Sequence, residues 1–193
     1  MLAAFGILFL GERLTARLGL AIVIAVAGLF LIFGLDWGEF DSRFRLGVAF
    51  GGLTALLYAT FLLVLRLVQS RPNAPDSVVT VAILSFVGAG VLAVYVWVGN
   101  ESFSVPNSQT WVVLVAYAIV CHVIGWVLIS SGLPGMQMSR AGLLLLLQPA
   151  FAFVWDVVFF GRPTAAIEIV GAALALTAIY LGTTGGRTEE SEV

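Results

Sequence analysis

Residues 141–164 read AGLLLLLQPAFAFVWDVVFFGRPT, and this stretch decides the fold. Its apolar part, 141–160, has the length of about 20 residues that a helix needs to cross the hydrocarbon core of a bilayer. Gln148 and Pro149 lie near the middle of this run, where proline removes a backbone donor and leaves a carbonyl one turn earlier without its usual partner. We therefore predict a transmembrane helix that is kinked at Pro149 and ends at Gly161.

Apolar runs of similar length recur along the chain. Together with 141–160 they make six predicted spans, the others covering 16–35, 46–68, 78–98, 111–133 and 165–183. The sequence is 61% hydrophobic and only 10% charged, whereas about a quarter of the residues of a soluble domain are charged. We expect an all-α fold, a polytopic transmembrane helix bundle embedded in a lipid bilayer.

Charge and cysteine content exclude several classes of function. The net charge is -2 and no basic tract is present, so no nucleic-acid partner is expected. Cys121 is the single cysteine, which excludes an intramolecular disulfide and a cysteine-based metal cluster. The zinc motif His-Glu-x-x-His does not occur, and we predict neither a metal site nor a cofactor. The acidic tail, residues 185–193, is expected to be disordered.

The beginning and the end of the chain resemble each other at a constant shift of 150 residues. The shift places Gly11, which ends the short apolar run 1–10, on Gly161. The helices that follow both glycines have small residues at three- and four-residue spacing, a pattern that allows close helix packing in lipid. Five predicted crossings separate the two glycines, so they lie on opposite faces of the membrane. This predicts an inverted-topology repeat, which is a recurring construction of secondary transporters.

The repeat also predicts how the chain is divided. Residues 1–10 extend over only about 15 Å as a helix, half of a bilayer core. We expect 1–35 to be the C-terminal part of a first repeat and 46–184 to be a complete second repeat of five transmembrane helices. The predicted fold is thus one of inverted five-helix repeats with the first repeat incomplete.

The stretch FLGERLT at residues 9–15, followed by a helix rich in small residues, resembles the end of an EamA domain of the drug/metabolite transporter superfamily. The second copy, from Gln148 to Thr164, is similar, but Arg162 stands where the family usually has glutamate. The resemblance implies ten spans in two inverted five-helix repeats. It also implies transport of amino acids, drugs or other small metabolites.

Four residues are candidates for substrate binding. His122 and Trp126 lie one helical turn apart near the middle of a predicted span, where an ionisable side chain is costly and usually faces a cavity or a partner. Gln148 lies beside the kink at Pro149, and Tyr58 lies on the face of the helix that also carries Thr54. For each of the four, hydrogen bonding or packing between helices is an open alternative.

Transport by alternating access, as a permease or exporter of small metabolites such as amino acids or drug-like compounds, is the function that these features favour. An enzyme is not expected, because His122 has no partner residues in a catalytic pattern. The alternative is a non-transporting membrane fragment or assembly module that needs a partner chain, and a homodimer is likewise open.

The arginines predict the orientation in the cell membrane, because basic residues are enriched in cytoplasmic loops. One side of the predicted topology carries Arg13, Arg17, Arg66, Arg71, Arg140 and Arg187, and the other side carries Arg43, Arg45 and Arg162. The excess of arginine predicts a multi-pass protein of the cell membrane with a cytoplasmic C-terminus.

Overall fold

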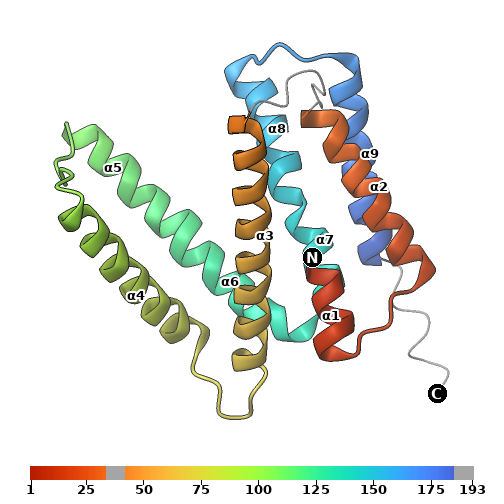
Figure 1. Ribbon diagram of the computed structural model, residues 1–193, viewed down its shortest axis with the longest axis horizontal. Helices are drawn as coiled ribbons and strands as arrows, with labels where there is room; N and C mark the ends of the chain where they lie inside the picture. The colour runs from red at the N-terminus through yellow and green to blue at the C-terminus, as the bar shows by residue number, and fades with distance from the viewer. Residues whose placement is uncertain (34–41, 185–193) are drawn as a thin grey trace. The chain divides into compact units, whose positions relative to one another are not determined.

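The computed structural model describes residues 1–33 and 42–184, and every regular element in these ranges is a helix, which confirms the predicted all-α class (Figure 1). In chain order the elements are α1 (Leu2–Leu10), α2 (Ala16–Phe33), α3 (Ser42–Gln69), α4 (Ser77–Val98), α5 (Ser108–Tyr117), the π-helix η1 (Ala118–Ile124), α6 (Gly125–Gly132), the 3₁₀ turn η2 (Leu133–Gly135), α7 (Met138–Leu145), α8 (Leu147–Phe160) and α9 (Ala166–Thr184).

Within the described residues, five helical segments are long and apolar enough to cross a membrane, as expected for a polytopic protein. They are Phe44–Gln69, Ser77–Val98, Ser108–Gly135, Met138–Phe160 and Ala166–Thr184. The predicted span 16–35 corresponds to α2, whose apolar part, Ala16–Ile32, is shorter than these five. Residues 34 and 35 and the predicted disordered tail lie outside the described residues.

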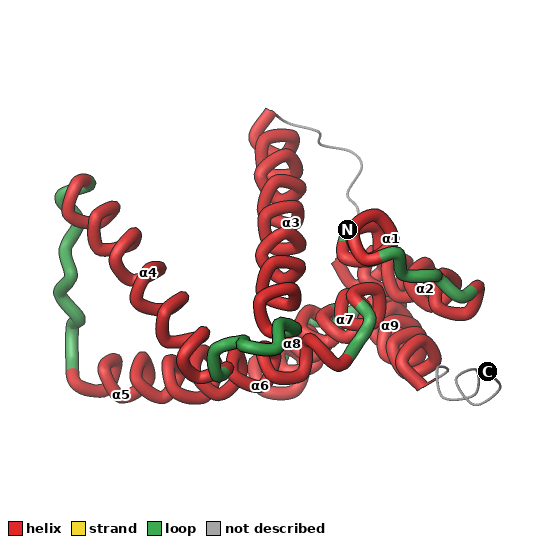
Figure 2. The backbone as a smooth tube through the Cα atoms, turned by 90° about the horizontal axis from the view of Figure 1, so that it is seen from below, coloured by secondary structure: helices red, strands yellow, loops and turns green. Residues whose placement is uncertain are grey.

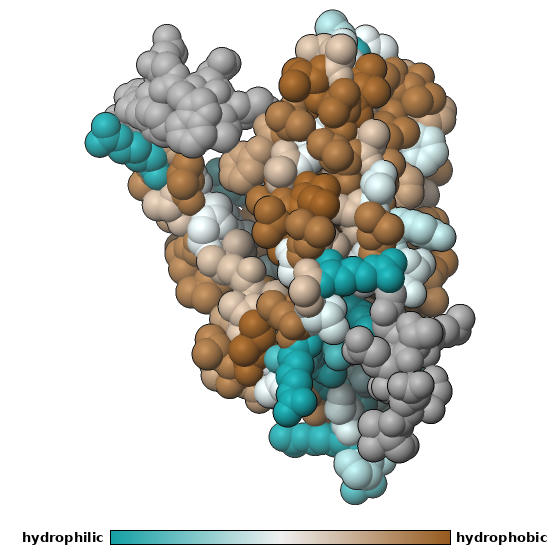
Figure 3. Space-filling model, turned by 90° about the vertical axis from the view of Figure 1, so that its right-hand side faces the viewer, coloured by the Kyte–Doolittle hydropathy of each residue, from teal (hydrophilic) through white to brown (hydrophobic). Residues whose placement is uncertain are grey.

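The surface is that of a membrane protein. Large apolar side chains such as Phe86, Trp97 and Phe160 are more than three-quarters exposed, at 80%, 77% and 82%. Figure 3 shows one face of the molecule, on which apolar side chains dominate and hydrophilic ones gather toward one end. In water such a surface would be strongly unfavourable, whereas in a bilayer it is the surface that contacts lipid.

The chain divides into two compact units, which are described separately. The first unit comprises Met1–Leu63 and Met136–Val193, and the second comprises Val64–Gly135. The first therefore contains α1, α2, most of α3, and α7 to α9. The second contains the end of α3 and the elements from α4 to η2.

In the first unit, α2 and α9 pack closely side by side, as both Figure 1 and Figure 2 show. A Cβ atom added to Gly28 would lie 2.6 Å from the carbonyl oxygen of Gly171 and 2.7 Å from the backbone nitrogen of Ala175. Near the other end of the pair, Ala21 approaches Gly182. The beginning of α2 therefore contacts the end of α9, and the end of α2 contacts the beginning of α9, so the two helices are antiparallel.

The ends of the helices repeat the shift of 150 residues. The helices α1 and α8 end at Leu10 and Phe160, and α2 and α9 begin at Ala16 and Ala166. The turn from α1 to α2 contains Gly11 with φ 63°, and the turn from α8 to α9 contains Gly161 with φ 60°, both in the left-handed region. The residue after each glycine donates a backbone hydrogen bond to the carbonyl six residues earlier. The amide of Glu12 donates to the carbonyl of Gly6 at 3.0 Å, and the amide of Arg162 donates to the carbonyl of Asp156 at 3.2 Å.

Equal turns followed by antiparallel helices give the two copies opposite orientations. This arrangement is the one that the internal repeat predicted. The boundaries of the two repeats, 1–35 and 46–184, stay a prediction, because the correspondence between the copies is seen only for α1 and α2 against α8 and α9.

In the second unit, polar side chains cap the beginnings of the helices. Asp76 accepts a hydrogen bond from the amide of Val78 at 2.7 Å where α4 begins, and Asn107 accepts one from the amide of Thr110 at 2.8 Å where α5 begins. Both side chains satisfy amides that have no partner inside their own helix. The unit is a hairpin in which α4 packs against α6.

We predict that Gly28→Ala destabilises the fold by about 1–3 kcal/mol, the usual cost of overpacking a tight contact, because the added methyl group meets backbone atoms of α9. The measurement is the midpoint of thermal unfolding in detergent. Gly19→Ala is the matched control on the same helix, since a Cβ there meets nothing within 4 Å. Equal midpoints for the two variants would contradict this account of the packing.

Candidate functional site

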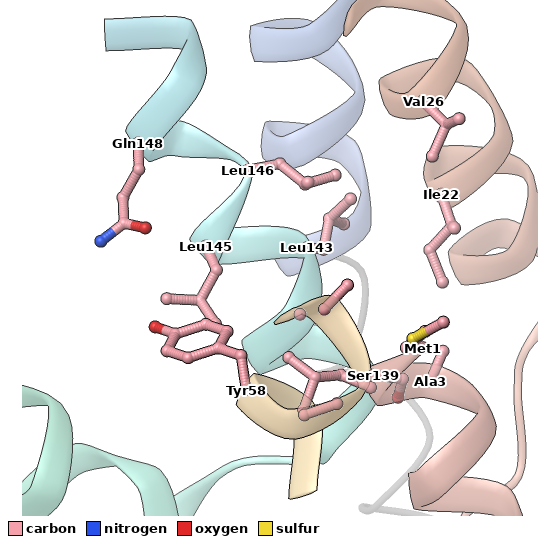
Figure 4. Close-up of a pocket in the computed structure, with 14 residues that line it drawn as sticks. Met1, Ala3, Ile22, Val26, Tyr58, Ser139, Leu143, Leu145, Leu146 and Gln148 are labelled. Carbon is pink, nitrogen blue, oxygen red and sulfur yellow. The ribbon is translucent and has the colours of Figure 1, made fainter. Parts of the chain in front are cut away.

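A cavity of about 330 Å³ lies in the first unit, between segments that are far apart in the sequence (Figure 4). It is lined by Met1, Leu2 and Ala3 of the α1 segment, Ile22 and Val26 of α2, Ala55, Tyr58 and Ala59 of α3, Ser139, Gly142, Leu143 and Leu145 of α7, Leu146 between the helices, and Gln148 of α8. Its volume is at the lower end of the range found for small-molecule sites.

The cavity lies against a break in a membrane-length helix. The helix α7 ends at Leu145, and α8 begins at Leu147 after a residue with φ -68° and ψ -11°. The amide of Leu146 donates to Leu143 at 3.2 Å, a tighter turn than that of an α-helix. Pro149 has no amide to offer the carbonyl of Leu145. The structure thus places the interruption within one turn of the predicted kink.

Two of the four predicted binding residues, Tyr58 and Gln148, line this cavity. Figure 4 shows both on one edge of it, while Ile22 and Val26 of α2 lie on the opposite edge in that view. The ring of Tyr58 also stacks with that of Phe61 on the same helix, with ring centres 6.5 Å apart. The cavity therefore combines a wide apolar wall with polar groups from α3 and α8.

The third polar side chain of the cavity, Ser139, was not predicted from the sequence. It is buried at the beginning of α7, and its hydroxyl donates to Glu12 Oε2 at 3.1 Å. Glu12 also accepts from the amides of Met138 at 2.6 Å and Ser139 at 3.2 Å. A serine beside a helix start is too common to signal a site, and a contact across 127 residues has no local sequence signature.

The other two candidates, His122 and Trp126, belong to the second unit and do not line the cavity. His122 lies in the π-helix, and its Nε2 is 2.9 Å from the hydroxyl oxygen of Ser85 on α4. That hydroxyl donates its hydrogen to the carbonyl of Val81 at 2.7 Å. The imidazole must then donate from Nε2, and the contact is an interhelical hydrogen bond.

This bond matches the structural alternative that the sequence left open for His122. Trp126 is partly buried on α6. In the segments 1–33 and 42–184, no group of three or more His, Cys, Asp or Glu side chains comes together in a way that could hold a metal ion.

Comparison with known proteins identifies a family and one curated relative. A model of the EamA-like transporter family matches residues 45–184. A curated relative, an "uncharacterized transporter" of Archaeoglobus fulgidus, is 22% identical over 172 residues. The match covers 89% of this chain but 58% of that relative, so the chain spans less than two-thirds of the relative's length. No solved structure matches significantly. Because the family model covers most of the chain, this membrane protein belongs to the EamA-like transporter family.

Proposed function

We propose that the chain carries a small solute across the membrane by alternating access, and that the cavity beside the α7–α8 break is its binding site. The observation that supports this proposal most directly is the position of the cavity. It lies at the interruption of a membrane-length helix, next to the antiparallel α2–α9 pair. Transporters with inverted repeats bind their substrates at such broken helices, where polar backbone groups become available.

The lining of the cavity supports an uncharged, mainly apolar solute. Among the described residues, none that lines it has a charged side chain, and most are aliphatic. A charged group would lose its hydration there, and no side chain of the lining offers it a counter-charge, which makes its binding costly. Tyr58, Ser139 and Gln148 offer hydrogen bonds for a few polar groups. Of the classes suggested by the family resemblance, drug-like compounds without charge fit better than amino acid zwitterions.

Transport is proposed in preference to catalysis. His122, the residue that would act as a base in an intramembrane enzyme, has its Nε2 engaged with Ser85 in the second unit. Membership of a transporter family supports the same choice.

The alternative is that the chain moves no solute by itself and acts as a membrane module with a second copy or a partner chain. The match covers 58% of the archaeal relative, and the activity of the whole relative is therefore a proposal for this chain. Flux through liposomes that contain only the purified chain separates the two. Folded protein that carries no member of a broad panel of solutes would favour the module.

The first prediction of this proposal concerns charge. Four compounds share one aromatic body: N-acetylphenylalaninamide is uncharged, phenylalanine is a zwitterion, N-acetylphenylalanine is an anion and phenylalaninamide is a cation. In proteoliposomes, with protein-free liposomes as the control for leakage, the uncharged compound should be carried at least about tenfold faster than the anion, since about 1.4 kcal/mol separates rates by that factor. Faster carriage of the anion or the cation would contradict the proposed substrate class.

The second prediction concerns Gln148. Gln148→Leu should raise KM for N-acetylphenylalaninamide about three- to tenfold, because one neutral hydrogen bond contributes about 0.5–1.5 kcal/mol. Gln109→Leu is the matched control at an exposed position outside the cavity and should leave KM unchanged. His122→Gln, which keeps a donor for Ser85, should also leave KM unchanged. A changed KM for His122→Gln together with an unchanged KM for Gln148→Leu would instead indicate a binding site in the second unit.

The third prediction concerns orientation, for which we propose a cytoplasmic C-terminus. The Arg17 guanidinium donates to the carbonyl of Leu181 at the C-terminal end of α9, whereas Arg162 pairs with Glu168 at its N-terminal end. The two arginines thus lie at opposite ends of the α2–α9 pair, in keeping with the uneven arginine count. Green fluorescent protein fused after Val193 should fluoresce, and alkaline phosphatase fused there should be inactive. Active alkaline phosphatase would show that the C-terminus lies outside the cytoplasm and would contradict the proposed orientation.

A further inference from the structure

We propose that Glu12 is a positioning residue that clamps the beginning of α7 to the α1 segment, and that this contact has to open for a solute to pass the cavity wall on the side of the seam. The proposal rests on the proposed transport function and assigns a role to a residue that lies outside the cavity. The contact between α1 and α7 is called the seam, and it is formed by Leu2, Gly6 and Glu12 on one side and Met138, Ser139 and Gly142 on the other.

The clamp consists of hydrogen bonds to the first turn of α7. Glu12 accepts from the amides of Met138 and Ser139 and from the hydroxyl of Ser139. The residue that precedes α7, Gln137, makes no side-chain cap of its own. Amides at the beginning of a helix have no partner within it, and they form the positive end of the helix dipole. A carboxylate is therefore the strongest acceptor that this position can receive.

The two sides of the seam are in close contact. A Cβ atom on Gly6 would collide with the Glu12 carboxylate and lie 3.3 Å from Met138 Cβ. A Cβ atom on Gly142 would lie 2.9 Å from Leu2 Cβ. Met138 and Ser139 are 0% and 1% exposed. Because Leu2, Gly142 and Ser139 also line the cavity, the seam is one of its walls.

Among the residues that the structure describes, the clamp is present at only one of the two equivalent breaks. The shift of 150 residues places Arg162 at the position of Glu12, and an arginine has no acceptor for helix amides. Arg162 instead donates to Glu168 at 2.9 Å, and its guanidinium lies 5.4 Å from the centre of the Phe153 ring. In alternating access the two ends of an inverted repeat open in turn. A clamp at one end favours the conformation in which that end is closed.

The clamp also controls a polar group of the cavity. The hydroxyl of Ser139 is directed to Glu12 while the seam is closed. Opening the seam would release this hydroxyl as a donor at the same moment as it exposes the wall. Glu12 thereby couples access to the cavity with the hydrogen bonds that the cavity offers.

The test measures opening of the seam without any solute. Met138→Cys is introduced into the full chain with Cys121→Ser, which removes the native cysteine, and the rate of labelling by a water-soluble maleimide is followed in detergent. Adding Glu12→Gln should speed the labelling of Cys at 138 at least about tenfold. The matched control is Glu168→Gln, which removes another carboxylate that accepts from a helix start, at Ala165, and should leave the rate unchanged. Equal rates with Glu12 and with Glu12→Gln would overturn the clamp.

A second variant tests whether the seam opens during transport and does not depend on removing Glu12. Leu2→Cys with Gly142→Cys, introduced together with Cys121→Ser, brings two thiols together across the seam. The two Cβ atoms would start 2.9 Å apart, so the seam has to widen slightly to reach the separation of about 3.5–4.5 Å that a disulfide requires. Oxidation should abolish carriage of N-acetylphenylalaninamide in proteoliposomes, and dithiothreitol should restore it. Full flux through fully cross-linked protein would overturn the proposal. Faster labelling with Glu12→Gln in a chain that carries no solute would support the clamp and contradict the proposed transport instead.

Discussion

The close packing of α2 against α9 is the constraint on which the first unit depends. Inside lipid the hydrophobic effect does not drive helices to associate, so van der Waals contacts between closely packed backbones have to stabilise the pair. Gly28 and Gly171 permit that contact, and buried alanines continue it along the pair. Because the two helices are antiparallel, the same contact sets the opposite orientation of the two glycine breaks. The break beside Glu12 is thereby held near α7, where the cavity forms.

The two breaks share a backbone conformation but differ in chemistry. Gly11 and Gly161 have nearly the same dihedral angles, and the turns around them make the same backbone hydrogen bond. One turn then presents a carboxylate to a neighbouring helix, and the other presents an arginine to its own helix. In the described residues, the two breaks therefore share one backbone geometry and differ in their side-chain contacts.

Much of the fold could be predicted from single residues and local patterns. The apolar runs predicted the membrane-length helices, and the repeated Phe-Leu-Gly and Phe-Phe-Gly predicted two equivalent breaks. Gln148 and Tyr58 were singled out because polar groups are rare in apolar helices, and both line the cavity; that they bind a substrate stays a prediction. His122 stood out for the same reason, yet the structure places it in an interhelical bond with Ser85. The rarity of a polar residue in a span shows that it has a partner but not which partner.

The sequence by itself determined the class of the protein, the positions of its helices and the glycine breaks, because helix length, apolar composition and backbone conformation depend on neighbouring residues. Only the tertiary structure decided which side chains meet. Glu12 reaches the beginning of α7 across 126 residues, and Ser139 becomes part of the cavity through that contact. The physical reason is that lipid-facing and protein-facing surfaces are both apolar in a membrane. The pattern of hydrophobic residues therefore does not reveal which helix faces pack together.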